Sequence, residues 1–329
     1  MIRAHLLETE TDSFIDAVRG KLDEGVELTV GVESPEPAEF DILISGVPRL
    51  DDIKASRRLR VLLIPWAGLP IMTRDLLVGP DGELLFPDIS IHNLHYNAAS
   101  TAEMAVTLMM SAARGIVPLD RALRRNDWSS RYLPPTWPVL ESRTALVLGY
   151  GSIGKKIGEI CDGLGMKVKA IRRRARADEH DRVEVHELRE LRALLLTTDA
   201  LFLSVPHTPE TRGMIGREEL ALLPDGAIVV NIARGPVIDQ EALYRALVSR
   251  RLRAGLDVWY NYPREKEKRE DTPPADFPFH ELDNVVMTPH VGGNTADDEY
   301  RRAIALADFL NRAARGEEPP NRVDPVRGY

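Results

Sequence analysis

The sequence predicts an α/β protein whose parallel sheets belong to two domains. Strand and helix patterns alternate along most of the chain, which is typical of consecutive βαβ units. A glycine-rich turn of the kind that opens a doubly wound sheet occurs only near residue 149 of 329, so a whole folding unit precedes it. The length also suits two domains with ample core.

The part of the chain before this turn predicts a small parallel α/β unit. Its expected strands are Ile2–Leu6, Glu27–Val32, Asp41–Ser45, Val61–Pro65 and Ile89–Leu94, and its expected helices are Asp12–Leu22, Leu50–Ala55 and Thr73–Leu77. A bridging helix is expected from about Ser100 to Arg114, opened by a capping box that ends at Glu103. Residues 119–142 are expected to be irregular, with aromatic side chains that form a dimer arm or pack on their own domain.

The segment Gly149–Gly154 fits the pattern G-x-G-x-x-G in the context that dinucleotide binding requires. We expect a buried strand at Thr144–Leu148 before it, a helix at Lys155–Leu164 after it, and a second strand at Lys167–Ile171. The first glycine allows a tight turn, the second lets the backbone approach a pyrophosphate, and the third lets helix and strand pack closely. We therefore predict a nucleotide site rather than a merely structural turn.

The end of the second strand indicates which dinucleotide is bound. An NAD-type site places a carboxylate about 20 residues after the first glycine, where it accepts from the ribose 2′-hydroxyl. Here Arg172 and Arg173 occupy that place. A guanidinium there can hold a 2′-phosphate with charge-assisted hydrogen bonds. We therefore predict that the site prefers NADP(H) to NAD(H). The alternative is that the two arginines only form a solvated basic turn.

The second half of the chain predicts a doubly wound sheet. Its further strands are expected at Asp199–Val205, Ala227–Ile232, Leu252–Val258 and Asn284–Thr288, its helices at Arg217–Leu223 and Gln240–Ser249, and a last helix at Ala296–Ala314. Ligands of such sheets bind beyond the carboxyl ends of the strands. The residues directly after these strands are therefore the candidates for chemistry.

Two of these residues suit reduction of a 2-oxo acid. That reaction needs a cation for the carboxylate and an acid for the developing alkoxide. Arg234 offers a rigid fork that matches a carboxylate, and His290 offers a pKa near neutrality.

Composition excludes several other classes. The formal net charge of −8 argues against a nucleic-acid partner, no stretch approaches a membrane span, and no cluster has metal-ligand spacing. The N-terminus lacks the apolar run of a signal peptide, so we expect a cytoplasmic protein. The single cysteine, Cys161, fits an apolar helix face and is expected in the core.

These motifs resemble those of the D-isomer-specific 2-hydroxyacid dehydrogenases, in the same order and over nearly the whole chain. The matching segments are Trp66–Leu69, Asn97 with Thr101–Glu103, His207–Arg212, Asn231–Asp239, Thr288–Thr295 and Asn321–Asp324. The resemblance implies a Rossmann cofactor domain, 99–289, inserted into a flavodoxin-like substrate domain, 1–98 plus 290–329. It also implies a homodimer formed through the cofactor domain.

The resemblance assigns roles to individual residues. Arg234 would bind the substrate carboxylate and carbonyl, and His290 would be the acid in reduction and the base in oxidation. The substrate would also meet Ala67, Gly68, Leu69, His95 and Asn97. Asp257 would hold the nicotinamide carboxamide. The expected cofactor contacts are Gly149, Tyr150, Gly151, Ser152, Ile153, Gly154, Arg172, Arg173, Val205, Pro206, Thr211, Ile232, Ala233, Arg234, Asp257, His290 and Gly292.

One position departs from the family. Where the family has a glutamate that pairs with the catalytic histidine, this chain has Tyr262. Tyr262 is a third catalytic candidate, which would orient His290 through a neutral hydrogen bond. Alternatively, a nearby carboxylate replaces the glutamate, or the chemical step is altered; the candidate carboxylates are Glu265, Glu267 and Glu281. Without an anionic neighbour the pKa of His290 should fall, so reduction should lose rate at a lower pH than in relatives.

Three functions are compatible with the sequence. The first is an NADP(H)-preferring oxidoreductase that acts on a small 2-oxo or 2-hydroxy acid. The second is a nucleotide-sensing protein of the corepressor kind, which needs no turnover. A formate-type dehydrogenase ranks below both, because formate dehydrogenases carry a glutamine where this chain has Tyr262.

Overall fold

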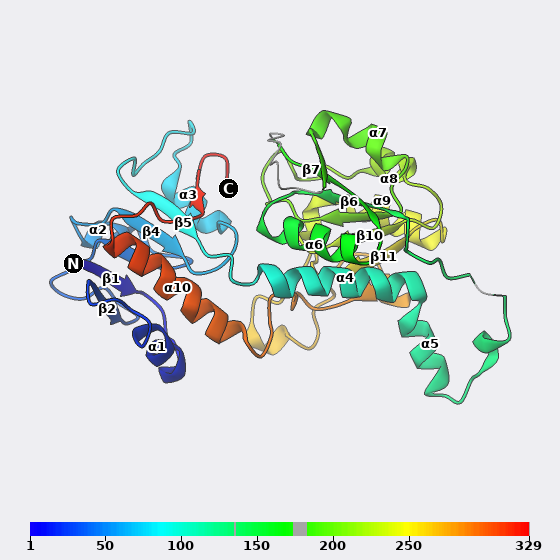
Figure 1. The fold of residues 1–329 in the computed structure, drawn as a ribbon, viewed down its shortest axis with the longest axis horizontal. Coiled ribbons are helices and arrows are strands. Elements are labelled where there is room, and N and C mark those ends of the chain that lie inside the picture. Colours follow the sequence, from blue (N-terminus) through cyan, green and yellow to red (C-terminus); the bar gives the residue numbers. More distant parts are fainter. Residues whose placement is uncertain (135, 174–182, 329) are drawn as a thin grey trace. The chain divides into compact units, whose positions relative to one another are not determined.

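A computed structural model describes residues 1–134, 136–173 and 183–328. The chain divides into two compact units, Met1–Asn97 with Asn294–Tyr329, and Ala98–Gly293 (Figure 1). Each unit is an α/β layer structure around a sheet that is wholly or almost wholly parallel. The predicted class, two α/β domains with parallel sheets, is confirmed.

The first unit has the flavodoxin-like strand order. Its sheet runs β13-β5-β4-β3-β1-β2, with β13 antiparallel to its neighbour β5. The strands are β1 (Ile2–Leu6), β2 (Val26–Val30), β3 (Ile42–Ile44), β4 (Val61–Ile64), β5 (Ser90–Asn93) and β13 (Arg322–Val323). Helices α1 (Asp12–Arg19) and α10 (Asp298–Ala314) pack on one face, and α2 (Leu50–Ala55) and α3 (Ile71–Leu77) on the other.

The second unit has the Rossmann strand order. Its seven parallel strands run β8-β7-β6-β9-β10-β11-β12, so the order reverses between β6 and β9. The strands are β6 (Thr144–Leu148), β7 (Lys167–Ile171), β8 (Glu184–His186), β9 (Ala200–Leu203), β10 (Ile228–Asn231), β11 (Arg253–Leu256) and β12 (Val285–Met287). Short 3-10 turns are η1 (Ser129–Arg131), η2 (Leu188–Glu190), η3 (Gly235–Val237), η4 (Lys266–Lys268) and η5 (Phe279–Glu281).

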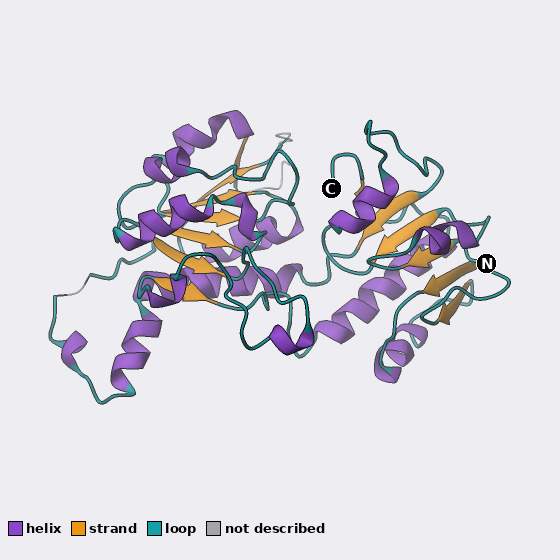
Figure 2. Cartoon of the chain, turned by 180° about the vertical axis from the view of Figure 1, so that it is seen from behind, coloured by secondary structure: helices purple, strands orange, loops and turns teal. Residues whose placement is uncertain are grey.

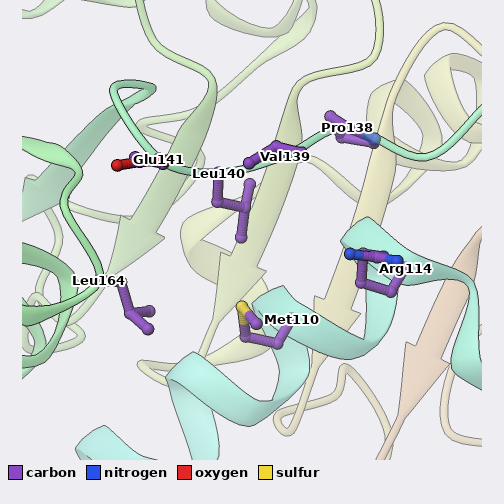
Figure 3. A pocket seen from close by; sticks show the side chains of 7 residues that line it. All are labelled: Met110, Arg114, Pro138, Val139, Leu140, Glu141 and Leu164. Atoms are coloured by element: carbon purple, nitrogen blue, oxygen red, sulfur yellow. The ribbon is translucent and has the colours of Figure 1, made fainter.

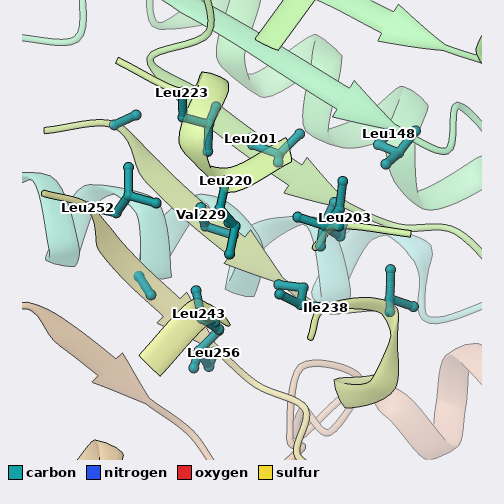
Figure 4. Packing of buried hydrophobic residues seen from close by; sticks show 14 of the residues in the cluster. Leu148, Leu201, Leu203, Leu220, Leu223, Val229, Ile238, Leu243, Leu252 and Leu256 are labelled. Carbon is teal, nitrogen blue, oxygen red and sulfur yellow. The ribbon is translucent and has the colours of Figure 1, made fainter. Parts of the chain in front are cut away.

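Helices cover both faces of this sheet (Figures 1 and 2). Helices α4 (Ala98–Arg114) and α6 (Ser152–Gly163) cover one face, and α7 (Leu191–Leu195), α8 (Arg217–Leu222) and α9 (Gln240–Val248) cover the other. Figure 4 shows the second of these cores, in which leucines of the central strands meet leucines of α8 and α9. Because both faces are buried, the strands are continuous apolar runs.

Several boundaries differ from the sequence-based expectation. The bridging helix α4 begins at Ala98, so Ser100 is a buried helical residue and the expected capping box is wrong. Residues 119–142 are not irregular throughout, since α5 (Ile116–Leu123) extends into them. Strands β8 and β13 and helix α7 were not expected, because each is only two to five residues long. Cys161 is buried, as predicted.

Helix α5 extends from the second unit with no buried residue of its own (Figures 1 and 2). Among the described residues, no single helix is long and apolar enough to cross a membrane; α4 and α5 satisfy the length and composition criteria only together, across a 63° bend.

Candidate active site

The turn between β6 and α6 requires glycine at two positions. Gly149 has φ +101°, and a Cβ there would lie 2.7 Å from the backbone carbon of Ser204. A Cβ on Gly154 would lie 2.0 Å from the carbonyl oxygen of Gly149. A larger residue at either place would force the helix away from the sheet.

Gly151, in contrast, faces open space. A Cβ on Gly151 would meet no heavy atom within 4 Å. This residue precedes the first turn of α6, where Ser152, Ile153 and Gly154 form the N-terminal end of a 12-residue helix. An open glycine backbone beside a helix N-terminus is the cradle that a pyrophosphate needs, so the residues present fit a dinucleotide.

The other expected cofactor contacts lie along the same edge of the sheet. Arg172 and Arg173 are exposed directly after β7, and the Arg172 N–H donates to the carbonyl of His186 at 3.0 Å. After β9, the Thr211 hydroxyl donates to the Pro206 carbonyl at 2.7 Å and so closes the loop that begins at Val205. The remaining members follow β6, β10, β11 or β12 and are Tyr150, which is buried, with Ile232, Ala233, Asp257 and Gly292.

Arg234 follows β10 in a turn that Asn231 shapes. The Asn231 amide accepts from the Ala233 N–H and donates to the Arg234 carbonyl, both at 3.0 Å. The exposed Arg234 side chain donates from Nη1 to the Ala233 carbonyl at 2.6 Å. A Cβ on Gly235 would lie only 2.3 Å from the Trp259 carbonyl oxygen, so this turn packs directly on the segment after β11.

His290 lies after β12 on a strap, residues 288–292, that Asp257 holds. Oδ1 of Asp257 accepts from the Thr288 hydroxyl at 2.6 Å and from the Val291 N–H at 2.9 Å. Oδ2 accepts from the Gly292 N–H at 2.8 Å. His290 itself has φ +59°, a left-handed conformation that costs about 1–2 kcal/mol in a residue other than glycine. The three bonds to Asp257 offset that cost.

Tyr262 is the partner of His290. Its hydroxyl oxygen lies 3.0 Å from Nδ1 of His290 and accepts from the Trp259 N–H at 3.0 Å. The Trp259 indole donates to the Thr288 carbonyl at 2.8 Å, so the same residue also ties down the strap. The arrangement has the geometry of the first alternative, a neutral hydrogen bond.

The alternative carboxylates have other neighbours. Glu265 lies 4.0 Å from Lys268, Glu281 lies 4.0 Å from His280, and Glu267 is exposed.

The electrostatics favour a neutral His290. Desolvation of the ring and then the positive charge of Arg234 lower the pKa of His290, while Asp257 opposes them. Desolvation raises the pKa of Tyr262, against the Trp259 N–H and the Arg234 charge. Near neutral pH, the pair of His290 and Tyr262, here called the dyad, therefore consists of an uncharged imidazole and an uncharged phenol.

The expected substrate residues lie in the first unit, after two adjacent parallel strands. Ala67, Gly68 and Leu69 follow β4, and Gly68 has φ +88°. His95 and Asn97 follow β5, which pairs with β4, so both groups lie at one edge of that sheet. Desolvation lowers the pKa of His95.

A pocket of about 200 Å³ lies in the second unit, away from that unit's glycine turn, Arg234 and His290 (Figure 3). It is lined by Met110, Arg114, Pro138, Val139, Leu140, Glu141 and Leu164. Leu140 and Glu141 come before β6, whereas the glycine turn comes after it, so the pocket is at the opposite edge of the sheet. Sequence reasoning did not find the strap contacts of Asp257 and Trp259, for which no local pattern exists.

The fold and the site together define a dinucleotide-binding α/β protein with an arginine after β10 and a histidine after β12, at the carboxyl edge of one sheet. A profile of the "D-isomer specific 2-hydroxyacid dehydrogenase, NAD binding domain" matches residues 106–292. The chain therefore belongs to the D-isomer-specific 2-hydroxyacid dehydrogenase family.

Similar proteins include two kinds of dehydrogenase. D-3-phosphoglycerate dehydrogenase of Methanocaldococcus jannaschii is 31% identical over 310 residues, covering 91% of this chain and 55% of that protein. The chain thus spans about half the length of that relative. Glyoxylate/hydroxypyruvate reductase B of Pectobacterium carotovorum is 32% identical over 241 residues, 72% of each chain.

A solved family structure covers the whole chain. The D-isomer specific 2-hydroxyacid dehydrogenase of Xanthobacter autotrophicus, in complex with NADPH and MES, has a TM-score of 0.79 and 25% identity and covers 100% of this chain and 99% of that one.

Proposed function

We propose that this chain transfers a hydride between NADP(H) and a small 2-oxo or 2-hydroxy acid. The observation that carries the proposal is the placement of Arg234 and His290. They follow β10 and β12, and β11 between these strands supplies Asp257, which holds the histidine strap. Family membership and the open glycine cradle support it.

Each side chain has one task in this reaction. The exposed Arg234 guanidinium would bind the substrate carboxylate and polarise the carbonyl. His290 would donate a proton from Nε2 to the carbonyl oxygen in reduction and take it back in oxidation, because its Nδ1 already faces Tyr262. A nicotinamide bound along the strand ends would supply or accept the hydride. Ala67, Gly68, Leu69, His95 and Asn97 would bind the substrate from the first unit.

The preference for NADP(H) rests on Arg172 and Arg173, which are exposed directly after β7. Their guanidinium groups suit a 2′-phosphate. The Xanthobacter structure in complex with NADPH supports this preference.

We also propose a homodimer, formed through the second unit. The arm, residues 116–134, carries apolar side chains that its own unit leaves exposed, including Ile116 at 52% and Tyr132 at 79%. Exposed apolar patches of this kind are typical of subunit interfaces. Sedimentation of the purified chain tests this: a mass near twice that of the chain is expected, and a monomer at all concentrations contradicts it.

The test of the function is turnover. NADPH and NADH are offered in parallel with glyoxylate, hydroxypyruvate, pyruvate and phenylpyruvate, and loss of the reduced-nicotinamide absorbance is followed. We expect turnover with at least one acid, faster with NADPH. Arg234→Lys keeps the charge but loses the fork, so kcat/KM should fall by about 10²-fold or more. Tight cofactor binding without turnover on any acid would favour the sensing protein instead.

A further inference from the structure

The hydroxyl of Tyr262 has one proton, and its surroundings determine where that proton points. A phenol donates once and accepts through its oxygen. The oxygen already accepts from the Trp259 N–H at 3.0 Å. Among the described residues, the acceptor that lies within hydrogen-bond distance of this hydroxyl is Nδ1 of His290, at 3.0 Å. The hydroxyl can therefore donate its proton to Nδ1.

This direction determines the tautomer of His290. A neutral imidazole whose Nδ1 accepts a hydrogen bond carries its own proton on Nε2. A carboxylate in the place of Tyr262 would act differently, because it only accepts and so favours the doubly protonated, charged ring. In this chain the phenol favours the neutral ring with Nε2–H, which can donate but has no positive charge.

Of the two charged groups near the pair, Arg234 acts in the same direction. The Arg234 guanidinium opposes a second positive charge on His290 and favours a negative charge on Tyr262. Asp257 has the opposite effect on both, but its oxygens already accept three hydrogen bonds from the strap. A tyrosinate formed here would keep the Trp259 N–H as a donor and Arg234 as a nearby cation.

We propose that the proton consumed in reduction originates on Tyr262 and passes through His290, an inference that rests on the proposed function. As the carbonyl carbon gains the hydride, its oxygen takes the Nε2 proton. Nδ1 takes the Tyr262 proton, and a tyrosinate remains. The tyrosinate then takes a proton from water, which reaches it because Tyr262 is 44% exposed. Tyr262 is thus a positioning and proton-supplying residue that acts through His290.

The relay changes the expected pH dependence. If an imidazolium were the acid, reduction would fade as the pH rises through the lowered pKa of His290. With the relay, the neutral dyad is the active form, so the rate persists until Tyr262 ionises. Because desolvation raises the pKa of Tyr262, that loss is displaced into the alkaline range. The relay therefore predicts a different profile from the acid-shifted one that an imidazolium acid with a lowered pKa would give.

Two experiments test the relay, the first without any turnover. Nitrogen NMR of histidine-labelled protein reports the tautomer of His290, with His290→Asn used to assign the signal. At neutral pH we expect Nε2–H in the wild-type protein and a mixture of tautomers in Tyr262→Phe. A wild-type ring that is charged at neutral pH, or that carries its proton on Nδ1, would overturn the proposal.

The second experiment compares pH profiles and solvent isotope effects of reduction. The wild-type protein should keep its kcat through the neutral range, and its solvent isotope effect should show that two protons move in the rate-determining step. Tyr262→Phe should be active only at acidic pH, and its solvent isotope effect should show the transfer of a single proton. Tyr262→Glu should regain activity near neutrality. Identical profiles for wild type and Tyr262→Phe would refute the relay. If no acid is turned over, the proposed function fails, and the NMR result still decides the direction of the Tyr262 proton.

Discussion

Replacing Asp257 by asparagine tests how the histidine strap is held. The carboxylate is 2% exposed and accepts from the Thr288 hydroxyl, the Val291 N–H and the Gly292 N–H. An asparagine has one acceptor oxygen. In the better of its two orientations, this oxygen keeps the hydrogen bonds from the Thr288 hydroxyl and the Val291 N–H. The NH₂ group then faces the buried Gly292 N–H, which is left without an acceptor.

The cost follows from these contacts. An unpaired buried N–H costs about 1–3 kcal/mol, and each of the two remaining bonds loses about 1 kcal/mol when its acceptor is no longer charged. Asp257→Asn should therefore destabilise the second unit by about 3–5 kcal/mol. For a unit of about 200 residues this lowers the melting temperature by roughly 6–20 °C.

The assay is thermal unfolding beside a matched control. Asp225 is 88% exposed and faces Arg251 at 3.8 Å, so Asp225→Asn removes the same charge at a cost below about 0.5 kcal/mol. The reasoning is refuted if the two variants melt at the same temperature.

Three further predictions concern the glycine turn, cofactor choice and the cysteine. Gly154→Ala should weaken NADPH binding at least tenfold in a fluorescence titration, because the new Cβ would lie 2.0 Å from a carbonyl oxygen. The control is Gly163→Ala, whose Cβ would meet no heavy atom within 4 Å and which should bind NADPH normally. Replacing Arg172 and Arg173 together by alanine should raise the Kd of NADPH by about 10-fold or more and leave that of NADH within about twofold; equal losses would refute the 2′-phosphate role. Burial raises the pKa of the Cys161 thiol to about 12, so it should stay protonated and resist thiol reagents at pH 8 until the chain unfolds.

Much of the site was predictable because the ends of the strands can be recognised from the local sequence. Each strand of the second unit is a short apolar run, and Arg234 and His290 follow such runs directly. In a parallel sheet the carboxyl ends of the strands share one edge. Position after a strand was therefore enough to place both residues at that edge. The glycines were predictable because Gly149 and Gly154 fill places that a Cβ cannot.

Other features depend on contacts that no local pattern reveals. Asp257 is 31 to 35 residues from the three donors it holds. The sequence indicated a carboxamide contact for it, not this clamp. Tyr262 was recognised only as a departure from the glutamate of the family. Its second hydrogen-bond partner, the Trp259 N–H, depends on how the chain turns after β11. The start of α4 was misplaced because burial of Ser100 outweighs its preference for a cap.

The most direct test of the proposed chemistry follows the transferred hydrogen itself. The wild-type chain is incubated with a 2-oxo acid and NADPH deuterated at the transferable position, and the product is examined by mass spectrometry and chiral chromatography. We predict one deuterium on the carbon that bore the oxo group and a single enantiomer, the D-isomer. His290→Asn should slow its formation by about 10²-fold or more. Bound NADPH with no deuterium in any product, or a product of mixed configuration, would contradict the account.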